Sequence, residues 1–104
     1  MYNETLKKAE SVTYDADTQE VIVVFKDSFR HAWPVRLLEM VKREAKGWVP
    51  LEGITDRQLS DVQVYGGDRY ILWDELGQAF QISDLLAGVY GREAWMQRLI
   101  ATAL

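Results

Sequence analysis

Histidine and carboxylate side chains are the groups of this 104-residue chain that come closest to a catalytic pattern. His31 is the only histidine, and a catalytic base or a metal ligand needs partners at a set geometry. The sequence has no Gly-x-Ser-x-Gly stretch and no His-x-x-x-His pair. Because His31 alternates with Phe29 and Trp33, we expect it to pack on one face of a strand.

Two acidic pairs, Asp15/Asp17 and Asp74/Glu75, carry the groups that glycoside hydrolysis or a divalent cation would use. Both pairs fall in predicted turns, where aspartate is common because its side chain bonds its own backbone two residues on. A metal site would need further acidic residues from elsewhere in the chain. We therefore interpret both pairs as turn residues.

Other motifs of enzymes and cofactor sites are missing from the sequence. Gly66-Gly67 lacks the Lys-Ser/Thr of a phosphate-binding loop and is predicted to be a hairpin turn. There is no cysteine, which excludes disulfides, thiolate catalysis and cysteine-ligated metals. We expect no catalytic, cofactor-binding or metal-binding residue and no cofactor, and we rank an enzyme third among the functions.

Four basic residues could form a phosphate-binding helix face: Arg36, Lys42, Arg43 and Lys46. They also suit the C-terminal end of a helix, where cations are stabilised by the helix dipole. The net charge of −4 and the pI of about 4.9 disfavour non-specific binding to nucleic acid. A nucleic-acid-associated regulator that uses this basic face of a Pro34–Ala45 helix is the alternative hypothesis.

Tryptophan is frequent, at positions 33, 48, 73 and 95. Core packing is the default, since each ring buries a large area. On the predicted strand around Trp73, alternate residues point to opposite faces, so one face is left for a partner unless the C-terminal helix covers it. The candidate partner surface comprises Trp73, Asp74, Glu75, Trp95 and Leu99.

The elements that must position these residues follow from hydrophobic periodicity and turn signals. Five consecutive apolar residues predict that Glu20–Lys26 is a strand buried on both faces, or nearly so. The remaining strands are predicted at Val12–Asp15, Phe29–Trp33, Val62–Tyr65, Arg69–Trp73 and Gln78–Ile82. Helices are predicted at Pro34–Ala45 with Gly47 as its stop, at Asp56–Ser60 after a capping box, at Ser83–Gly88 with Ser83 as its cap, and at Arg92–Leu104.

The length favours one domain spanning residues 1–104, with Met1–Glu10 either a frayed tail or a helical turn. The N-terminal residues lack the apolar run of a signal peptide, and no stretch is apolar enough to cross a membrane. We expect a cytoplasmic protein. The predicted fold is α+β, with a twisted antiparallel sheet of five to six short strands, two main helices and one short helix.

The amino-acid sequence of several segments resembles an uncharacterised bacterial family, domain of unknown function 2442. The matching segments are Val21–Ser28, Trp33–Leu38, Leu59–Val62, Ile71–Leu76 and Ile82–Gly88. This resemblance covers roughly Val12 to Gly91, and it implies an α+β fold with a twisted antiparallel sheet and no established activity. Some members of that family resemble partners in toxin–antitoxin-like gene pairs.

The chain departs from the family pattern after the Trp73 strand. Asp74 stands where the family often has proline, and Gly77-Gln78-Ala79 replaces an acidic run. Any role that those acidic residues have in relatives is therefore not expected here. Our leading hypothesis is a non-enzymatic protein-interaction domain, an adaptor or antitoxin-like partner, with a protein partner or self-association.

Overall fold

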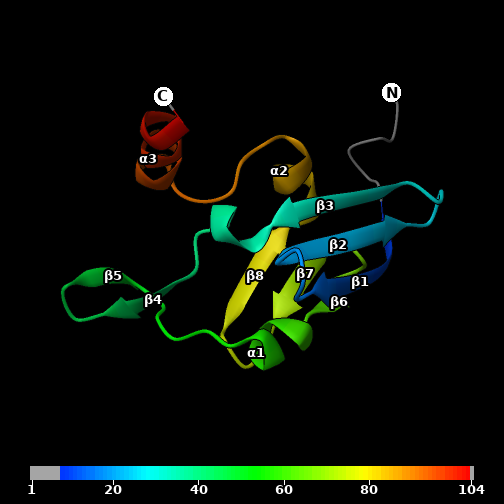
Figure 1. Ribbon diagram of the computed structural model, residues 1–104, viewed down its shortest axis with the longest axis horizontal. Coiled ribbons are helices and arrows are strands. Elements are labelled where there is room, and N and C mark those ends of the chain that lie inside the picture. The colour runs from blue at the N-terminus through cyan, green and yellow to red at the C-terminus, as the bar shows by residue number, and fades with distance from the viewer. Residues whose placement is uncertain (1–7, 104) are drawn as a thin grey trace.

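The computed structural model describes residues 8–103, which fold as antiparallel sheets and short helices (Figure 1). The strands are β1 (Ala9–Asp15), β2 (Glu20–Phe25), β3 (Arg30–Pro34), β4 (Val41–Glu44), β5 (Gly47–Pro50), β6 (Gln63–Tyr65), β7 (Tyr70–Trp73) and β8 (Gln78–Gln81). The helices are α1 (Asp56–Ser60), α2 (Ile82–Leu86) and α3 (Glu93–Ala103), with a 3₁₀ turn η2 (Val35–Leu37). The predicted α+β class is confirmed.

The described strands form three sheets rather than the one sheet that was predicted. Their orders are β1-β2-β3, β4-β5 and β6-β7-β8, and every pair is antiparallel. The first and third sheets meet where β1 lies beside β6, and the Ala9 N–H donates to the Asp68 carbonyl at 3.0 Å. Hairpin β4–β5 and α3 lie to one side of this body, along the 41 Å long axis (Figure 1).

The core lies between the two three-stranded sheets. On β2 the side chains of Val21, Val23 and Phe25 are buried, whereas Ile22 and Val24 are half-buried. The run of β-branched residues forms a strand, as its composition favours. The prediction of burial on both faces is correct for one face only, because the other face is half-buried. On the facing sheet, the fully buried side chains are Ile71 and Trp73 of β7, with Ile82 and Leu85 of α2.

Strand β3 differs from its prediction because it is the edge of its sheet. Only Trp33 of its predicted inner face is buried, while Phe29 and His31 are exposed. The His31 ring stacks on Trp33 with centroids 5.5 Å apart and an interplanar angle of 17°. His31 therefore packs against a neighbouring side chain of its strand, as predicted, but it remains exposed to solvent.

The predicted Pro34–Ala45 helix is wrong. Pro34 ends β3, and after the turn η2 the three consecutive residues Leu38, Glu39 and Met40 are all buried. A helix on a surface would turn at least one of three consecutive side chains outward. The chain then forms hairpin β4–β5, whose two-residue turn is closed by Gly47 at φ +125°.

Several element boundaries also change. The capping box is confirmed, because the Thr55 side chain accepts from the Gln58 N–H. Ser83 is not a cap, since α2 begins at Ile82 with Gln81 in the cap position and no side-chain cap bond. Ala9 is buried in β1, so a tail that ends at residue 10 is too long; residues 1–7 and 104 lie outside the described part.

Among residues 8–103, no helix is long and apolar enough to cross a membrane.

Candidate functional site

The predicted partner surface is divided by the fold. The Trp73 side chain is 0% exposed, and its indole N–H donates to the Leu59 carbonyl at 2.8 Å, so the inclusion of Trp73 was wrong. The alternation along β7 was recognised, but the face that was expected to be free is the core face. Trp95 and Leu99 lie half-buried on α3, away from the β7–β8 turn beside α1 (Figure 1).

The acidic turn Asp74-Glu75 is held against α1. Glu75 accepts from Gln58 Nε2 at 2.9 Å and from Arg57 Nη2 at 3.3 Å. The bond from Gln58 and the charge of Arg57 lower the pKa of Glu75 below its ordinary value. Asp74 is exposed. The turn therefore has a structural role, and its use by a partner stays a prediction.

The other acidic pair also has a backbone role, because Asp15 Oδ1 accepts from the Asp17 N–H at 2.9 Å. Gly66-Gly67 forms a turn with positive φ at both residues, as predicted. Within residues 8–103, no group of three or more histidine, aspartate or glutamate residues is placed to hold a metal ion.

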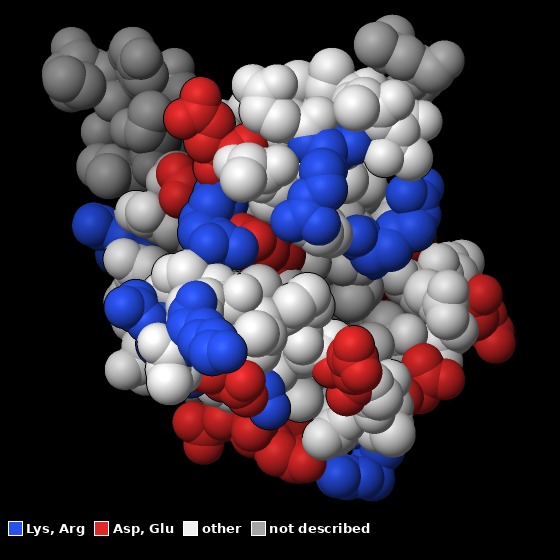
Figure 2. Space-filling model, turned by 90° about the vertical axis from the view of Figure 1, so that its left-hand side faces the viewer, with Lys and Arg blue, Asp and Glu red and all other residues white. Residues whose placement is uncertain are grey.

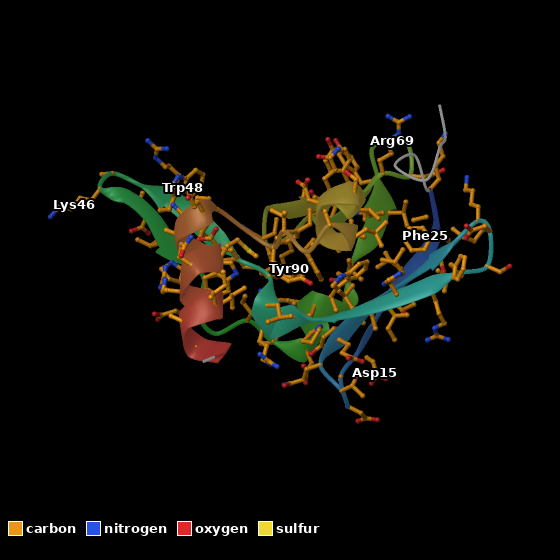
Figure 3. All side chains as sticks on the ribbon, turned by 90° about the horizontal axis from the view of Figure 1, so that it is seen from above. Asp15, Phe25, Lys46, Trp48, Arg69 and Tyr90 are labelled. Carbon is orange, nitrogen blue, oxygen red and sulfur yellow. The ribbon has the colours of Figure 1, made fainter. Side chains whose placement is uncertain are left out.

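The four basic residues predicted to share a helix face lie on η2 and on hairpin β4–β5 instead. Lys42 pairs with Glu44 at 3.2 Å, and the Arg43 guanidinium lies 5.3 Å from the centre of the Trp48 ring. Lys46 is at the tip of the hairpin (Figure 3). The basic helix face that motivated the nucleic-acid hypothesis therefore does not exist.

Two adjoining clefts open on the side of the molecule that carries α3 and hairpin β4–β5. The first, of about 430 Å³, follows β8, with each residue from Gly77 to Gln81 in its wall. The second, of about 270 Å³, lies between α3 and the segment from η2 to Ile54. Glu39, Val41, Trp48 and Arg92 border both clefts, so these residues form the wall between them.

The ion pair Glu39–Arg92 is the centre of this wall. The Glu39 side chain is 5% exposed, and its carboxylate accepts from Arg92 Nη2 at 2.6 Å, from Nε at 3.1 Å and from the Arg92 backbone N–H at 2.9 Å. Such bidentate, charge-assisted bonds are among the strongest in proteins. They lower the pKa of Glu39 and raise that of Arg92. The pair fastens the start of α3 to the body.

Gly91 and Trp95 complete this attachment of α3. A Cβ atom at Gly91 would lie 2.5 Å from the Cβ of Glu39 and 2.8 Å from Trp95 Cδ1, so only glycine fits. The Trp95 indole N–H donates to the Leu37 carbonyl at 2.7 Å. Below the wall, the Gln78 side chain donates to the Val41 carbonyl at 2.7 Å and accepts from the Val41 N–H at 3.2 Å, which ties the hairpin to β8.

Trp48 is the tryptophan of this wall, and it is 46% exposed. The guanidinium groups of Arg43 and Arg92 lie 5.3 Å and 5.7 Å from its ring centre, within the range of cation–π attraction. From above, Trp48 lies beside α3, and Tyr90 lies on the segment that leads into it (Figure 3). An exposed aromatic side chain at the junction of two clefts is suited to contact with a partner.

Sequence reasoning missed Glu39, Gln78 and the position of Trp48, because it assigned Pro34–Ala45 to a helix. The aromatic and β-branched residues Trp48 and Val49, directly after the turn glycine Gly47, were the available signal for a strand. No local signal marks Glu39 or Gln78, since the bonds that attach them to other elements, to Arg92 and to Val41, span 53 and 37 positions.

Comparison with solved structures finds a protein of unknown function from Rhodospirillum rubrum ATCC 11170. It is 30% identical, with a TM-score of 0.73, and the match covers 86% of this chain and 96% of that one. The two proteins belong to one family. No protein-family model and no curated protein matches the chain. The similarity to the Rhodospirillum rubrum protein supports the fold described above, and it gives no information on activity because the function of that protein is unknown.

Proposed function

We propose that the chain is a protein-interaction domain without catalytic activity, which binds an extended segment of a partner along β8. The observation that carries this proposal is the free edge of that strand. Within residues 8–103, β8 pairs with β7 on one side and with no strand on the other. Unpaired edges of this kind add strands from other chains.

The register identifies the backbone groups that would bind. The Ile82 N–H donates to the Arg69 carbonyl at 2.9 Å, on the β7 side. Because bonded pairs alternate in an antiparallel ladder, Phe80 and Gln78 also point to β7, whereas Ala79 points outward. The outward backbone groups lie along the first cleft, whose wall contains the whole strand.

The shape and lining of the first cleft support an extended peptide. Its volume of about 430 Å³ also lies within the range of small-molecule pockets, roughly 300–1,000 Å³. However, the cleft runs along strand β8, and the exposed apolar side chains of Trp48 and Val89 line it. A partner strand would bond β8 and place alternate side chains on these two residues.

The test is affinity capture from the native host with three versions of the chain. Ala79→Pro removes an outward N–H without removing a bond to β7, and proline is tolerated at sheet edges. Ala79→Ser is the matched control, because it keeps the N–H. We expect a stoichiometric partner with the wild type and Ala79→Ser, and its loss with Ala79→Pro. Capture of no partner, or equal capture by Ala79→Pro, would contradict the proposal.

We also propose that the protein is a bacterial, cytoplasmic adaptor or antitoxin-like partner. The relative from Rhodospirillum rubrum supports the bacterial origin. The resemblance to domain of unknown function 2442 supports the antitoxin-like role. Genetic linkage is its test: deletion of this protein should change the toxicity or the stability of the product of a neighbouring gene. The alternative to a partner of different sequence is self-association, and light scattering would detect it as a molar mass above that of the monomer.

A further inference from the structure

The second cleft has an apolar floor beneath α3. Leu38 and Met40 are buried, and Leu51 and Ile54 are half-buried beside them. Its volume of about 270 Å³ is below the roughly 300–1,000 Å³ of small-molecule pockets. An apolar recess of this size suits one or two large side chains of a protein partner better than a metabolite.

The rim of this cleft is basic. Its charged lining residues are Arg36, Arg92, Arg98 and Glu39. The Glu39 carboxylate is bonded to Arg92, so the charges of Arg36 and Arg98 are not offset within the lining. Arg98 also lies 5.7 Å from the ring centre of Trp95. This local positive charge contrasts with the net charge of −4 of the whole chain.

The same contrast is visible on the molecular surface. On the face that carries hairpin β4–β5 and α3, basic side chains gather around uncharged surface in the upper half, with acidic side chains toward its left, and acidic side chains are frequent along the lower edge (Figure 2). Complementary charge steers encounter and excludes partners of the wrong sign. A partner that enters the cleft from this side meets a positive rim around an apolar recess.

We infer that the second cleft binds a partner segment in which acidic residues flank a large aliphatic or aromatic side chain. The side chain fills the apolar recess, and the carboxylates lie against Arg36 and Arg98 at the rim. This inference rests on the proposed function, because it assumes a protein partner. It concerns a different cleft from β8, so different variants test it.

A nucleic acid is the competing polyanion, and the lining favours a peptide over it. Base stacking needs open aromatic faces. Here Trp95 is half-buried and Arg98 lies over its ring. Trp48 is more exposed, but the guanidinium groups of Arg43 and Arg92 lie over its ring. The floor is aliphatic, which matches a Leu-like or Phe-like side chain rather than a base.

Selection from a library of random short peptides displayed on phage tests this inference. We expect the selected peptides to combine aspartate or glutamate with leucine, phenylalanine or tryptophan. Each reversal, Arg36→Glu and Arg98→Glu, should weaken binding of a selected peptide about tenfold. Arg30→Glu is the matched control, since Arg30 is exposed at the far end of β3 and the change in net charge is the same (Figure 1).

Four results would overturn the inference. The first two are a selection that yields no binder and selected peptides that lack acidic residues. The third is equal weakening of peptide binding by Arg30→Glu and Arg98→Glu. The fourth is an oligonucleotide that displaces the bound peptide at a concentration below that at which the free peptide does so. If the peptide selection fails but Ala79→Pro still loses a native partner, the inference about the second cleft is rejected and the proposal that β8 binds a partner strand is kept.

Discussion

Replacement of Gly91 by alanine should release α3 from the body while the core stays folded. The added Cβ would lie 2.5 Å from the Cβ of Glu39, and that atom is attached to the backbone and cannot rotate away. It would also lie 2.8 Å from Glu39 Oε1 and from Trp95 Cδ1. Carbon atoms in contact are normally about 3.5–4.0 Å apart, so the backbone at residue 91 or at Glu39 must shift by about 1 Å, and the Trp95 ring must move as well.

The expected cost is about 1–3 kcal/mol, the usual penalty of an added carbon in a filled space. This cost falls on the bonds that hold α3, because Glu39 and Trp95 carry them. On α3, Trp95, Met96 and Leu99 are only half-buried, and Ile100 is 57% exposed. An element with so few buried contacts opens locally before the core does.

Amide hydrogen exchange measures this outcome element by element. Protection of α3 amides should fall by a factor of about 5–150, whereas protection in β2 and β7 should be unchanged. The control Ala94→Gly weakens the helix itself by roughly 0.5–1 kcal/mol and leaves Glu39 in place. Titration of Glu39 by NMR separates the two variants, because its pKa should rise only in Gly91→Ala. Equal loss of protection in α3 and β7 would refute this reasoning.

Three further predictions concern single interactions. Because Arg92 lowers the pKa of Glu39, their pairing stabilises the fold above the ordinary glutamate pKa of about 4.3, and the stabilisation is lost as the pH falls through the lowered value. Urea unfolding between about pH 3 and pH 7 should show this acid loss in the wild type and not in Arg92→Met. Trp73→Phe should lower the free energy of unfolding by about 1–3 kcal/mol, measured by urea denaturation, since a buried carbonyl of α1 loses its donor; an unchanged midpoint would contradict it. Burial and the bond to Asp56 raise the pKa of Tyr14 to about 12; an ultraviolet titration should follow the ionisation of Tyr14 at about this pH, and Asp56→Asn should lower its pKa.

The elements that were predicted correctly are those whose signals are local. Strand β2 follows from its β-branched run, and α1 follows from the capping box of Thr55 and Gln58. The alternation along β7 was also evident from its sequence. The core face could not be assigned, because it depends on where the other sheet packs.

The hairpin β4–β5 was missed because its sequence also has helical spacing. Apolar residues at Leu37, Leu38 and Val41 suit one face of a helix, and the basic residues that follow suit a helix end. Contacts with residues distant in the sequence, namely Glu39 with Arg92 and Val41 with Gln78, favour the hairpin over the helix. Tertiary contacts of this kind override local propensity, and the clefts that depend on them were hidden for the same reason.

The indole ring of Trp48 has a consequence for how the two clefts work together. It borders both of them and is held by cation–π contacts rather than by burial. A ligand that moves this ring to fit one cleft changes the wall of the other. Thermodynamic linkage then requires that each cleft alter the affinity of the other by the same factor. A partner that occupies both clefts with two separate segments would therefore bind them cooperatively or antagonistically, according to the position that the ring adopts.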